Sequence, residues 1–322
     1  MPLVRIGHLS TFYHTSILIQ ARGDAARALE SEIDWRMFGT GPEIIDALGK
    51  KELDLAYVGL PPSIIGIARG VKIRCVAGGH IEGTVLCGKN RFKGFPEADH
   101  LGDILEQFRG LKIGVPGTGS IHDVILRECL DRFGLSNEVE VIHYSWADLI
   151  TEEAVRNELS AAIGTPALAV ALRRYADSKV LYPPSRLWPS NPSYGILADS
   201  AFLAERRNVA EKFLALHEDA TALLRNRPEE ASGIISDYVG IIDKEFVLDT
   251  IRLSPKYCAQ LTEDYIASTM RFVASMKKLG YIPDEIPPSE IFDTSLIEKV
   301  HSGGSHYEEG IHLADRALDD AY

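Results

Sequence analysis

Strand-like and helix-like segments alternate through the first two hundred residues, and this order constrains the fold more than any single motif. The segments with a strand pattern lie at residues 4–8, 33–38, 53–58, 73–77 and 84–87. The first three are each followed by a segment with a helix pattern, at residues 15–20, 41–49 and 61–70. A repeated strand–helix–strand order predicts an α/β sheet whose strands are mostly parallel.

A second α/β series follows a polar connection at residues 88–110. Its segments are a strand at 112–115, a glycine-rich turn at 116–120, a helix at 121–133 and strands at 139–142, 161–163 and 179–181. The chain then changes to long amphipathic helices, at 209–227, 229–238, 244–251 and 263–279. We therefore predict two α/β units and a helical C-terminal part. For the polar tail at 301–322 the sequence allows two predictions, a surface helix or a mobile end.

Composition limits the classes of protein that need to be considered. The 322 residues are 45% apolar, which is enough for two domains. The net charge of −12 disfavours non-specific nucleic-acid binding, which needs a basic surface. No apolar run approaches the ~18 residues of a membrane span, and no apolar signal segment follows Met1. We expect a periplasmic or other extracytoplasmic protein if a signal was removed, and a cytoplasmic one if Met1 is the native start.

Motifs for common cofactors and for covalent catalysis are missing from the sequence. Cys75, Cys87, Cys129 and Cys258 form no CxxC pair, and we expect them to be buried apolar residues. The glycine-rich run at 114–119 is neither a phosphate-binding loop nor a dinucleotide-binding pattern. No HExxH or G-x-S-x-G motif occurs. The sequence therefore predicts no metal, no cofactor and no assigned catalytic residue.

One type of loop recurs, with Gly, Thr, Ser or Pro between the end of a strand and the start of a helix. Its four instances lie at residues 39–42, 59–63, 117–120 and 164–166. Small residues let a ligand approach the backbone, and helix N-termini offer free N–H groups. In open α/β sheets, ligands bind beyond the carboxyl ends of the strands. Because the four loops come from two α/β units, they predict a ligand cleft between these units.

Several of these segments, in their order along the chain, carry a family resemblance. They are the Gly39–Pro42 helix start, Asp54–Gly59 with the following Pro-Pro-Ser, Gly70–Ile73, Leu111–Ser120, Phe202–Leu203, Val209–Leu214, Arg227–Ala231 and Ile291–Ile297. This series resembles the nitrate/sulfonate/taurine group of ABC-transporter solute-binding proteins, which shares its fold with thiamine-pyrimidine synthase-like proteins. The resemblance extends over about residues 3 to 300, and the shared order is its strongest part.

The resemblance implies a periplasmic-binding-protein type II-like α/β fold, with two lobes and a ligand cleft between them. Lobe one would comprise residues 1–88 plus 195–300 and lobe two residues 89–194, with 301–322 as a C-terminal tail. Hinge closure of the lobes would bury the ligand. The loops that match the family's contact loops contain Ser10, Thr11, Phe12, His14, Gly39, Thr40, Gly41, Leu60, Pro61, Ser63, His80, Glu82, Thr118, Gly119, Ser120, His122, Thr165, Asn191 and Tyr194.

These loops contain no Lys or Arg except Arg186 at their margin, which is a departure from what a dianionic ligand would require. A glutamate in the cleft, Glu82, would further disfavour an anion. Aromatic walls could come from Phe12, Tyr13, Trp146, Trp188 and Tyr194. We therefore expect a neutral or weakly cationic organic ligand, with a heteroaromatic compound as one candidate.

We therefore predict a monomeric solute-binding protein that captures a small organic molecule by lobe closure and delivers it to an ABC permease. The alternative is a cytoplasmic enzyme of the same fold, similar to pyrimidine synthases, a desulfinase or menaquinone-pathway enzymes, acting on a small aromatic or heteroaromatic substrate. Such an enzyme would have to use His14, His80, His122 or Glu82 as acid or base. A ligand-sensing regulator is a third, weaker reading, because no helix-turn-helix segment is apparent.

Overall fold

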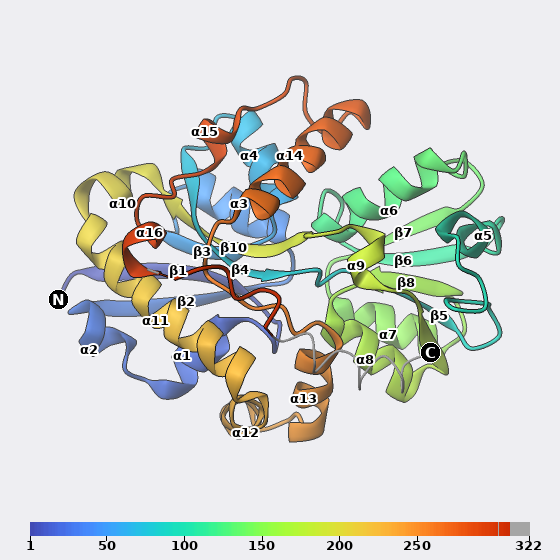
Figure 1. Cartoon of the computed structure of the whole chain (residues 1–322), viewed down its shortest axis with the longest axis horizontal. Coiled ribbons are helices and arrows are strands. Elements are labelled where there is room, and N and C mark those ends of the chain that lie inside the picture. The colour runs from blue at the N-terminus through green and yellow to red at the C-terminus, as the bar shows by residue number, and fades with distance from the viewer. Residues whose placement is uncertain (302, 310–322) are drawn as a thin grey trace.

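Two five-stranded sheets form the centres of two α/β lobes, as the computed structural model shows for residues 1–301 and 303–309 (Figure 1). The first sheet has the order β2-β1-β3-β10-β4. Its strands are β1 (Leu3–Leu9), β2 (Glu32–Phe38), β3 (Leu55–Val58), β4 (Ile73–Ile81) and β10 (Pro192–Asp199). Strand β1 pairs in parallel with β2 and β3, whereas β10 lies antiparallel between β3 and β4.

The second sheet repeats this plan, with the order β7-β6-β8-β5-β9. Its strands are β5 (Val85–Lys89), β6 (Lys112–Pro116), β7 (Glu140–Tyr144), β8 (Ala161–Gly164) and β9 (Ser178–Tyr182). Strand β6 pairs in parallel with β7 and β8, and β5 lies antiparallel between β8 and β9. In each sheet the one antiparallel strand is the strand with which the chain enters from the other lobe. The chain crosses between the lobes twice, between β4 and β5 and between β9 and β10 (Figure 1).

Helices cover both faces of each sheet (Figure 1). Those before the second crossing are α1 (Thr15–Arg22), α2 (Ala25–Leu29), α3 (Gly41–Gly49), α4 (Leu60–Ala68), α5 (Leu101–Glu106), α6 (Ile121–Arg132), α7 (Ala147–Val155), α8 (Pro166–Tyr175) and α9 (Pro184–Leu187). Those after it are α10 (Ser200–Glu205), α11 (Arg207–Asn226), α12 (Pro228–Val239), α13 (Lys244–Leu253), α14 (Glu263–Lys278), α15 (Pro288–Ile291) and α16 (Ile297–Val300).

Local sequence explains where the helices near the cleft begin. Thr40 and Glu43 form a reciprocal capping box at the start of α3. The hydroxyl of Ser120 accepts a hydrogen bond from the N–H of Asp123 at the start of α6, and Thr165 caps α8 in the same way. Proline in the first turn of α3, α4 and α8 fits positions whose N–H groups have no partner within the helix. The loops between strands and helices are therefore ordered by their own sequence.

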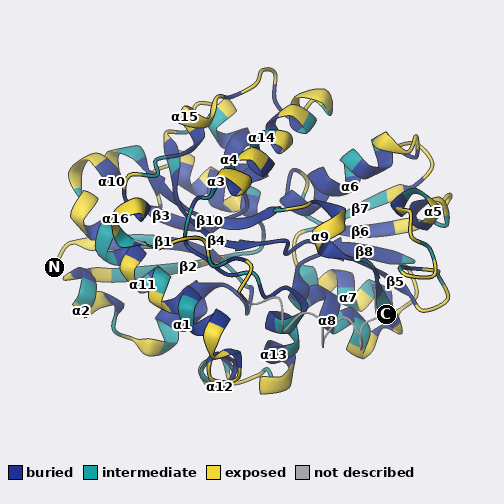
Figure 2. Cartoon of the chain, viewed as in Figure 1, coloured by how far each residue is buried: buried dark blue, intermediate teal, exposed yellow. Residues whose placement is uncertain are grey.

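The core runs through the inner strands of both sheets, which are dark blue in Figure 2, whereas the edge strands β2 and β7 contain no buried residue. Every residue of β3 and β10 is buried, because helices pack on both faces of these strands. Cys75, Cys87, Cys129 and Cys258 are all buried and unpaired, which confirms the prediction made for the cysteines. Helix α13 packs against α12 of lobe one and against α8 of lobe two. Among the residues described, no helix combines the length and the apolar character that crossing a membrane requires.

Candidate functional site

A pocket of about 110 Å³ lies where the loops at the strand ends of the two lobes meet. This volume is the space open to the centre of a water molecule, and about 10–15 Å³ of it is enough to hold one water. The pocket therefore accommodates several waters or a small organic molecule. It is lined by Leu9, Ser10, Thr11, Phe12, Tyr13, His14, Gly39, Thr40, Gly41, Gly59, Pro62 and Ser193 from lobe one, by Pro116, Ser120, Ile121, His122, Ala147, Asp148, Thr151, Thr165, Ala167, Leu168 and Ala171 from lobe two, and by Phe246 of α13.

The N-termini of six helices converge on this pocket. The residues that begin α1, α3 and α4 in lobe one and α6, α7 and α8 in lobe two are all among its lining residues or next to them. The first N–H groups of a helix have no partner within the helix, and the helix dipole makes this end partly positive. Hydrogen-bond acceptors on a bound molecule are therefore favoured from both sides of the cleft.

Two side-chain atoms of the lining residues are buried without a hydrogen-bond partner in the described structure. They are Oγ1 of Thr11 and Nδ1 of His14, whose side chains are almost entirely inaccessible to solvent. Leaving a buried polar atom unpaired costs roughly 1–3 kcal/mol. Such atoms are uncommon in folded proteins, and here two of them belong to the loop that joins β1 to α1. Rotation of these two side chains toward a bound ligand with donor and acceptor groups would satisfy both atoms.

The two histidines of the pocket are neutral at physiological pH. Burial lowers the pKa of His122 to about 3. Burial also lowers the pKa of His14 well below its ordinary value, and the neighbouring His80 adds to the effect. His122 is held by a 3.0 Å hydrogen bond between its Nδ1 and Oγ1 of Thr84, in the first crossing of the chain. Because neither ring is charged, neither provides a counter-ion for an anionic ligand.

Aromatic and apolar groups make up much of the remaining wall. The rings of Phe12 and Phe246 meet edge to face with their centroids 6.3 Å apart, and Tyr13 also lines the pocket. Asp148 contributes the only carboxylate among the described lining residues, and its side chain is exposed at the mouth of the pocket. No Lys or Arg is found among these residues.

The structure brings ten of the expected contact residues together in the pocket. They are Ser10, Thr11, Phe12, His14, Gly39, Thr40, Gly41, Ser120, His122 and Thr165. It places the other nine elsewhere. Leu60, Pro61 and Ser63 lie in the buried first turn of α4. Thr118 lines a separate hollow beside Tyr281, and Gly119 lies next to Ile65 of α4. His80, Glu82, Asn191 and Tyr194 lie at or near the crossings between the lobes. Neighbours that sequence reasoning did not select, Gly59 and Pro62, line the pocket instead of Leu60 and Pro61.

Glu82 lies in the first crossing between the lobes and does not line the pocket. Its Oε1 accepts a 3.0 Å hydrogen bond from the N–H of Ser190, and its Oε2 lies 3.0 Å from Nζ of Lys256. Its backbone N–H donates to the carbonyl of Asn191, so the two crossings are joined side by side. The expectation that Glu82 repels an anionic ligand is therefore wrong, because its charge is already paired with Lys256.

His80, Asn191 and Tyr194 are buried behind the pocket. Nε2 of His80 lies 2.6 Å from the carbonyl oxygen of Ser254, to which it donates. The ring of Tyr194 packs against His14, with centroids 4.0 Å apart. Both amide atoms of Asn191 are buried without a partner in the described part of the chain. Of the aromatic residues expected at the wall, Trp188 stacks on Phe272 away from the pocket.

The lobes touch across the cleft. A Cβ atom added to Gly39 of lobe one would lie 2.6 Å from the carbonyl oxygen of Ser145 and 3.0 Å from the ring of Trp146 in lobe two. Arg174 of α8 forms ion pairs with Asp243, which precedes α13, and with Asp249, which lies within α13. The hydroxyl of Tyr281 donates a 2.6 Å hydrogen bond to Asp123 of α6. The structure therefore shows the lobes in a closed arrangement around the pocket.

Comparison with known families identifies the kind of protein to which this pocket belongs. The model of the NMT1-like family matches residues 2–236, which is well over half of the chain. The chain belongs to the NMT1-like family. This NMT1-like chain is 24% identical over 243 residues to a protein of Brucella abortus named as a binding protein, a match that spans 74% of this chain and 72% of the relative.

Solved structures share the fold of this NMT1-like chain at low sequence identity. The ligand-binding component of an ABC-type import system from Staphylococcus aureus, crystallised with zinc, has a TM-score of 0.77 at 14% identity and covers 94% of this chain and 100% of its own. The alkanesulfonate-binding protein of Xanthomonas axonopodis, bound to MOPS, has a TM-score of 0.75 at 16% identity and covers 91% and 98%. These similarities confirm the two-lobed fold predicted from the sequence.

Part of the pocket of this NMT1-like chain comes from segments that no sequence pattern marked as a site. Ala147, Asp148 and Thr151 lie on α7, Ala167 and Ala171 on α8, and Phe246 on α13. The residue that precedes α7 at its N-cap position is Trp146, and the indole of Trp146 makes no capping hydrogen bond. The strand-end pattern that predicted the other loops is therefore weak at this loop. The Phe12–Phe246 contact depends on how α13 packs between the lobes, which is a tertiary feature.

Proposed function

We propose that this protein is a solute-binding protein that captures a small organic molecule between its lobes for an ABC-type importer. The observation that carries the proposal is the pocket between the two lobes, with six helix N-termini around it and with two lining residues, Thr11 and His14, whose Oγ1 and Nδ1 atoms are buried without a partner among the described residues. A molecule bound there would be enclosed by both lobes. Binding would thus favour the closed arrangement over an open one.

The ligand is a small uncharged molecule with an aromatic or heteroaromatic ring and at least one hydrogen-bond acceptor. Phe12, Tyr13 and Phe246 offer apolar faces for a ring. The helix N-termini favour acceptors, and the absence of Lys and Arg from the described lining disfavours a strongly charged anion. The expectation that the ligand could be weakly cationic loses its support, because the Glu82 carboxylate is paired with Lys256 outside the pocket.

The lobes move about the two crossings of the chain. Lobe one comprises most of residues 1–88 together with 195–300, and lobe two most of 89–194, with β5 belonging to the second sheet and β10 to the first. At the crossings, Glu82 and Ser190 both adopt positive φ angles, of 60° and 54°. A change in the backbone angles of a few residues at such positions is sufficient for hinge closure.

The partner of the closed form is an ABC permease, and the protein itself acts as a monomer. An importer takes its substrate from the outer side of the membrane, so the protein acts in the periplasm or on the outer side of the cell. Light scattering during size-exclusion chromatography measures the oligomeric state, and a dimer at micromolar concentration would contradict this part of the proposal.

A screen for ligands that raise the melting temperature tests the function. The panel contains neutral heteroaromatic compounds, their amine derivatives, nitrate and short alkanesulfonates. A ligand that binds only the folded state raises the melting temperature. Each hit is incubated overnight with the protein and then analysed by mass spectrometry.

The proposal expects a ring compound as a hit and its recovery in unchanged form. Recovery of a new compound would show that the protein is an enzyme of the same fold, with the pocket residues His14 and His122 as the first candidates for acid–base roles. Tight binding of nitrate or an alkanesulfonate, without binding of any ring compound, would overturn the proposed ligand class. It would leave the solute-binding function standing.

A further inference from the structure

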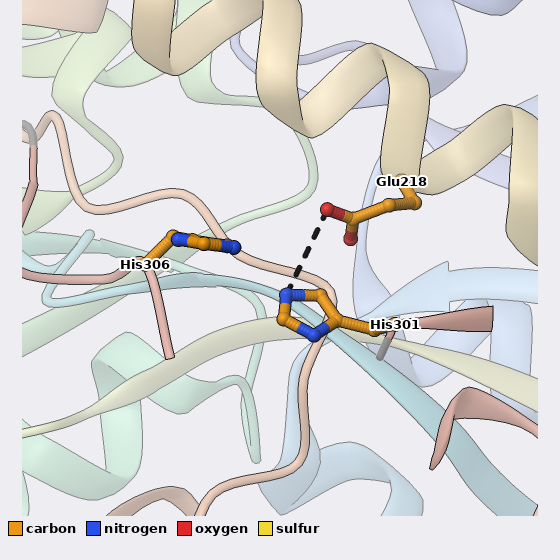
Figure 3. Close-up of side chains that lie close together, drawn as sticks. All are labelled: Glu218, His301 and His306. Carbon is orange, nitrogen blue, oxygen red and sulfur yellow. Dashed lines mark ion pairs between the residues drawn. The ribbon is translucent and has the colours of Figure 1, made fainter. Parts of the chain in front are cut away.

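Three potential metal ligands converge on the face of lobe one where the C-terminal segment crosses helix α11. They are the carboxylate of Glu218 on α11 and the imidazoles of His301 and His306, and one ligand atom from each lies within 4.8 Å of the other two. Figure 3 shows the three side chains turned toward a common point. None of them lines the ligand pocket, so the cluster is independent of the proposed function.

The spacing of these atoms fits a small tetrahedral cation. Nε2 of His301 lies 3.7 Å from Oε1 of Glu218. Two ligands of one zinc ion lie about 3.3–3.8 Å apart, because zinc–ligand bonds are about 2.0–2.3 Å long and meet at tetrahedral angles. Small rotations of the side chains therefore bring the three atoms to coordination distance.

A fourth donor stands beside the same imidazole. Sγ of Cys258, in the segment between α13 and α14, lies 3.4 Å from Nε2 of His301. The same sulfur is within 3.5 Å of the backbone N–H of His306. The side chain of Cys258 is fully buried, and its thiol forms no disulfide. Sγ of Cys258 is not one of the atoms that lie within 4.8 Å of one another, so its side chain has to turn toward a shared ion to bind it. A thiolate turned in this way would complete a set of four ligands with the two imidazoles and the carboxylate, as in structural zinc sites.

Surrounding groups orient the imidazole of His306. Its Nδ1 lies 2.7 Å from Oε1 of Glu309, to which it donates, so that Nε2 is left free to bind a cation. The carboxylate of Glu309 is itself 3.1 Å from Nε of the buried Arg225. Metal-binding histidines in proteins usually donate their other N–H to a carboxylate in this way. A buried ring nitrogen of His301, Nδ1, has no partner among the described residues.

We propose that Glu218, His301 and His306 bind one divalent transition-metal ion, zinc according to the donor set, with Cys258 as the fourth ligand. The ion joins the segment at 303–309 to α11 and to the segment that precedes α14. The segment at 303–309 already packs on lobe one through Tyr307, whose hydroxyl donates to the carbonyl of Gln260. The site is structural, because its four ligands leave no open position for a substrate.

Titration of the chelator-treated protein with zinc tests the site. The readouts are calorimetry and the melting temperature, and the variants are Glu218→Gln, His301→Ala and His306→Ala. The matched control is His100→Ala, which removes an exposed histidine of lobe two. The proposal expects one zinc ion per wild-type or H100A chain and a rise in melting temperature of about 5 °C at a hundredfold excess over the dissociation constant. H301A and H306A should lose at least tenfold in affinity.

Two outcomes would overturn the proposal: no zinc binding by the wild-type protein, or equal binding by wild type, H301A and H306A. H306A gives the decisive comparison, because His306 is partly exposed and its loss leaves the core of lobe one intact. Cobalt titration tests the fourth ligand separately. The proposal expects a thiolate-to-cobalt charge-transfer band in the wild-type complex and its loss in Cys258→Ser, and a wild-type complex without this band would overturn the role of Cys258.

Discussion

The Cβ position of Gly39 lies 2.6 Å from the carbonyl oxygen of Ser145, although the two residues belong to different lobes. This distance is shorter than a real Cβ contact, and the opposing atom belongs to the backbone. Only a residue without a side chain allows the lobes to approach this closely. The contact thus couples the residue type at position 39 to closure of the cleft.

Gly39→Ala should weaken ligand binding while leaving the lobes folded. The added methyl group forces the lobes apart, and overpacking of this kind costs enough to reduce affinity by about tenfold or more. Gly49→Ala is the matched control, because its added Cβ would meet only a side-chain carbon of Val71 at 3.4 Å. Calorimetry measures the affinity and thermal melting the stability. Equal affinity in both variants would show that closure does not require the Gly39–Ser145 contact.

Arg174→Gln should also favour the open form, but more weakly. The substitution removes ion pairs with Asp243 and Asp249 that join α8 to the α13 region. These carboxylates are exposed, so we expect a loss of affinity of about threefold at low salt that diminishes at high salt. Arg156→Gln is the control, because Arg156 pairs with Glu152 and Glu153 within α7 alone. A salt-independent loss in R174Q would point to another cause, such as its contact with the Phe246 ring.

Acid should destabilise the fold below pH 6.5. Burial lowers the pKa of His80 to about 3 and that of His217 to about 4 in the folded protein. In the unfolded chain these pKa values return to about 6.5, so the unfolded state binds more protons below that pH. The stabilisation is complete above pH 6.5 and is lost as the pH falls toward 3, by about 2 kcal/mol per histidine at pH 5.

Urea unfolding of His80→Gln at pH 7 and pH 5 tests this effect. The glutamine amide can donate to the carbonyl of Ser254 in place of the imidazole N–H, so the variant should fold. Its stability should depend less steeply on pH than that of the wild-type protein. His100→Gln, at an exposed position, should retain the wild-type slope. If H80Q and H100Q have the same slope, His80 is not a source of the acid sensitivity.

The order of strands and helices was predictable because hydrophobic periodicity is a local property. Residues 112–115, for instance, predict a strand, and the structure has β6 at Lys112–Pro116. Strand β10 was not predicted, because Pro192, Ser193 and Gly195 are typical of turns. Its burial between β3 and β4 overrides these local preferences. The strand is nonetheless central, because it carries the second crossing of the chain.

The pocket was predictable only in part, for the same reason. The loops at 10–14, 39–41 and 117–122 follow strand ends, so that their place at one edge of the sheets follows from topology. Which residue of a loop faces the ligand depends on the direction of the backbone there. In α4, Pro62 lines the pocket and its neighbours Pro61 and Ser63 do not. The pairing of Glu82 with Lys256 brings together residues from opposite halves of the chain. No local pattern contains that information.

The most direct test of ligand capture in this pocket is calorimetric titration of the screened ligand into wild-type protein and Thr11→Val. The substitution keeps the shape of the side chain and removes a buried hydroxyl that has no protein partner. We predict an unchanged or higher melting temperature without ligand, and 1:1 binding that is about tenfold weaker in T11V than in wild type. Equal affinity of the two proteins would contradict the account, because it would show that the ligand makes no hydrogen bond with the unpaired hydroxyl of Thr11.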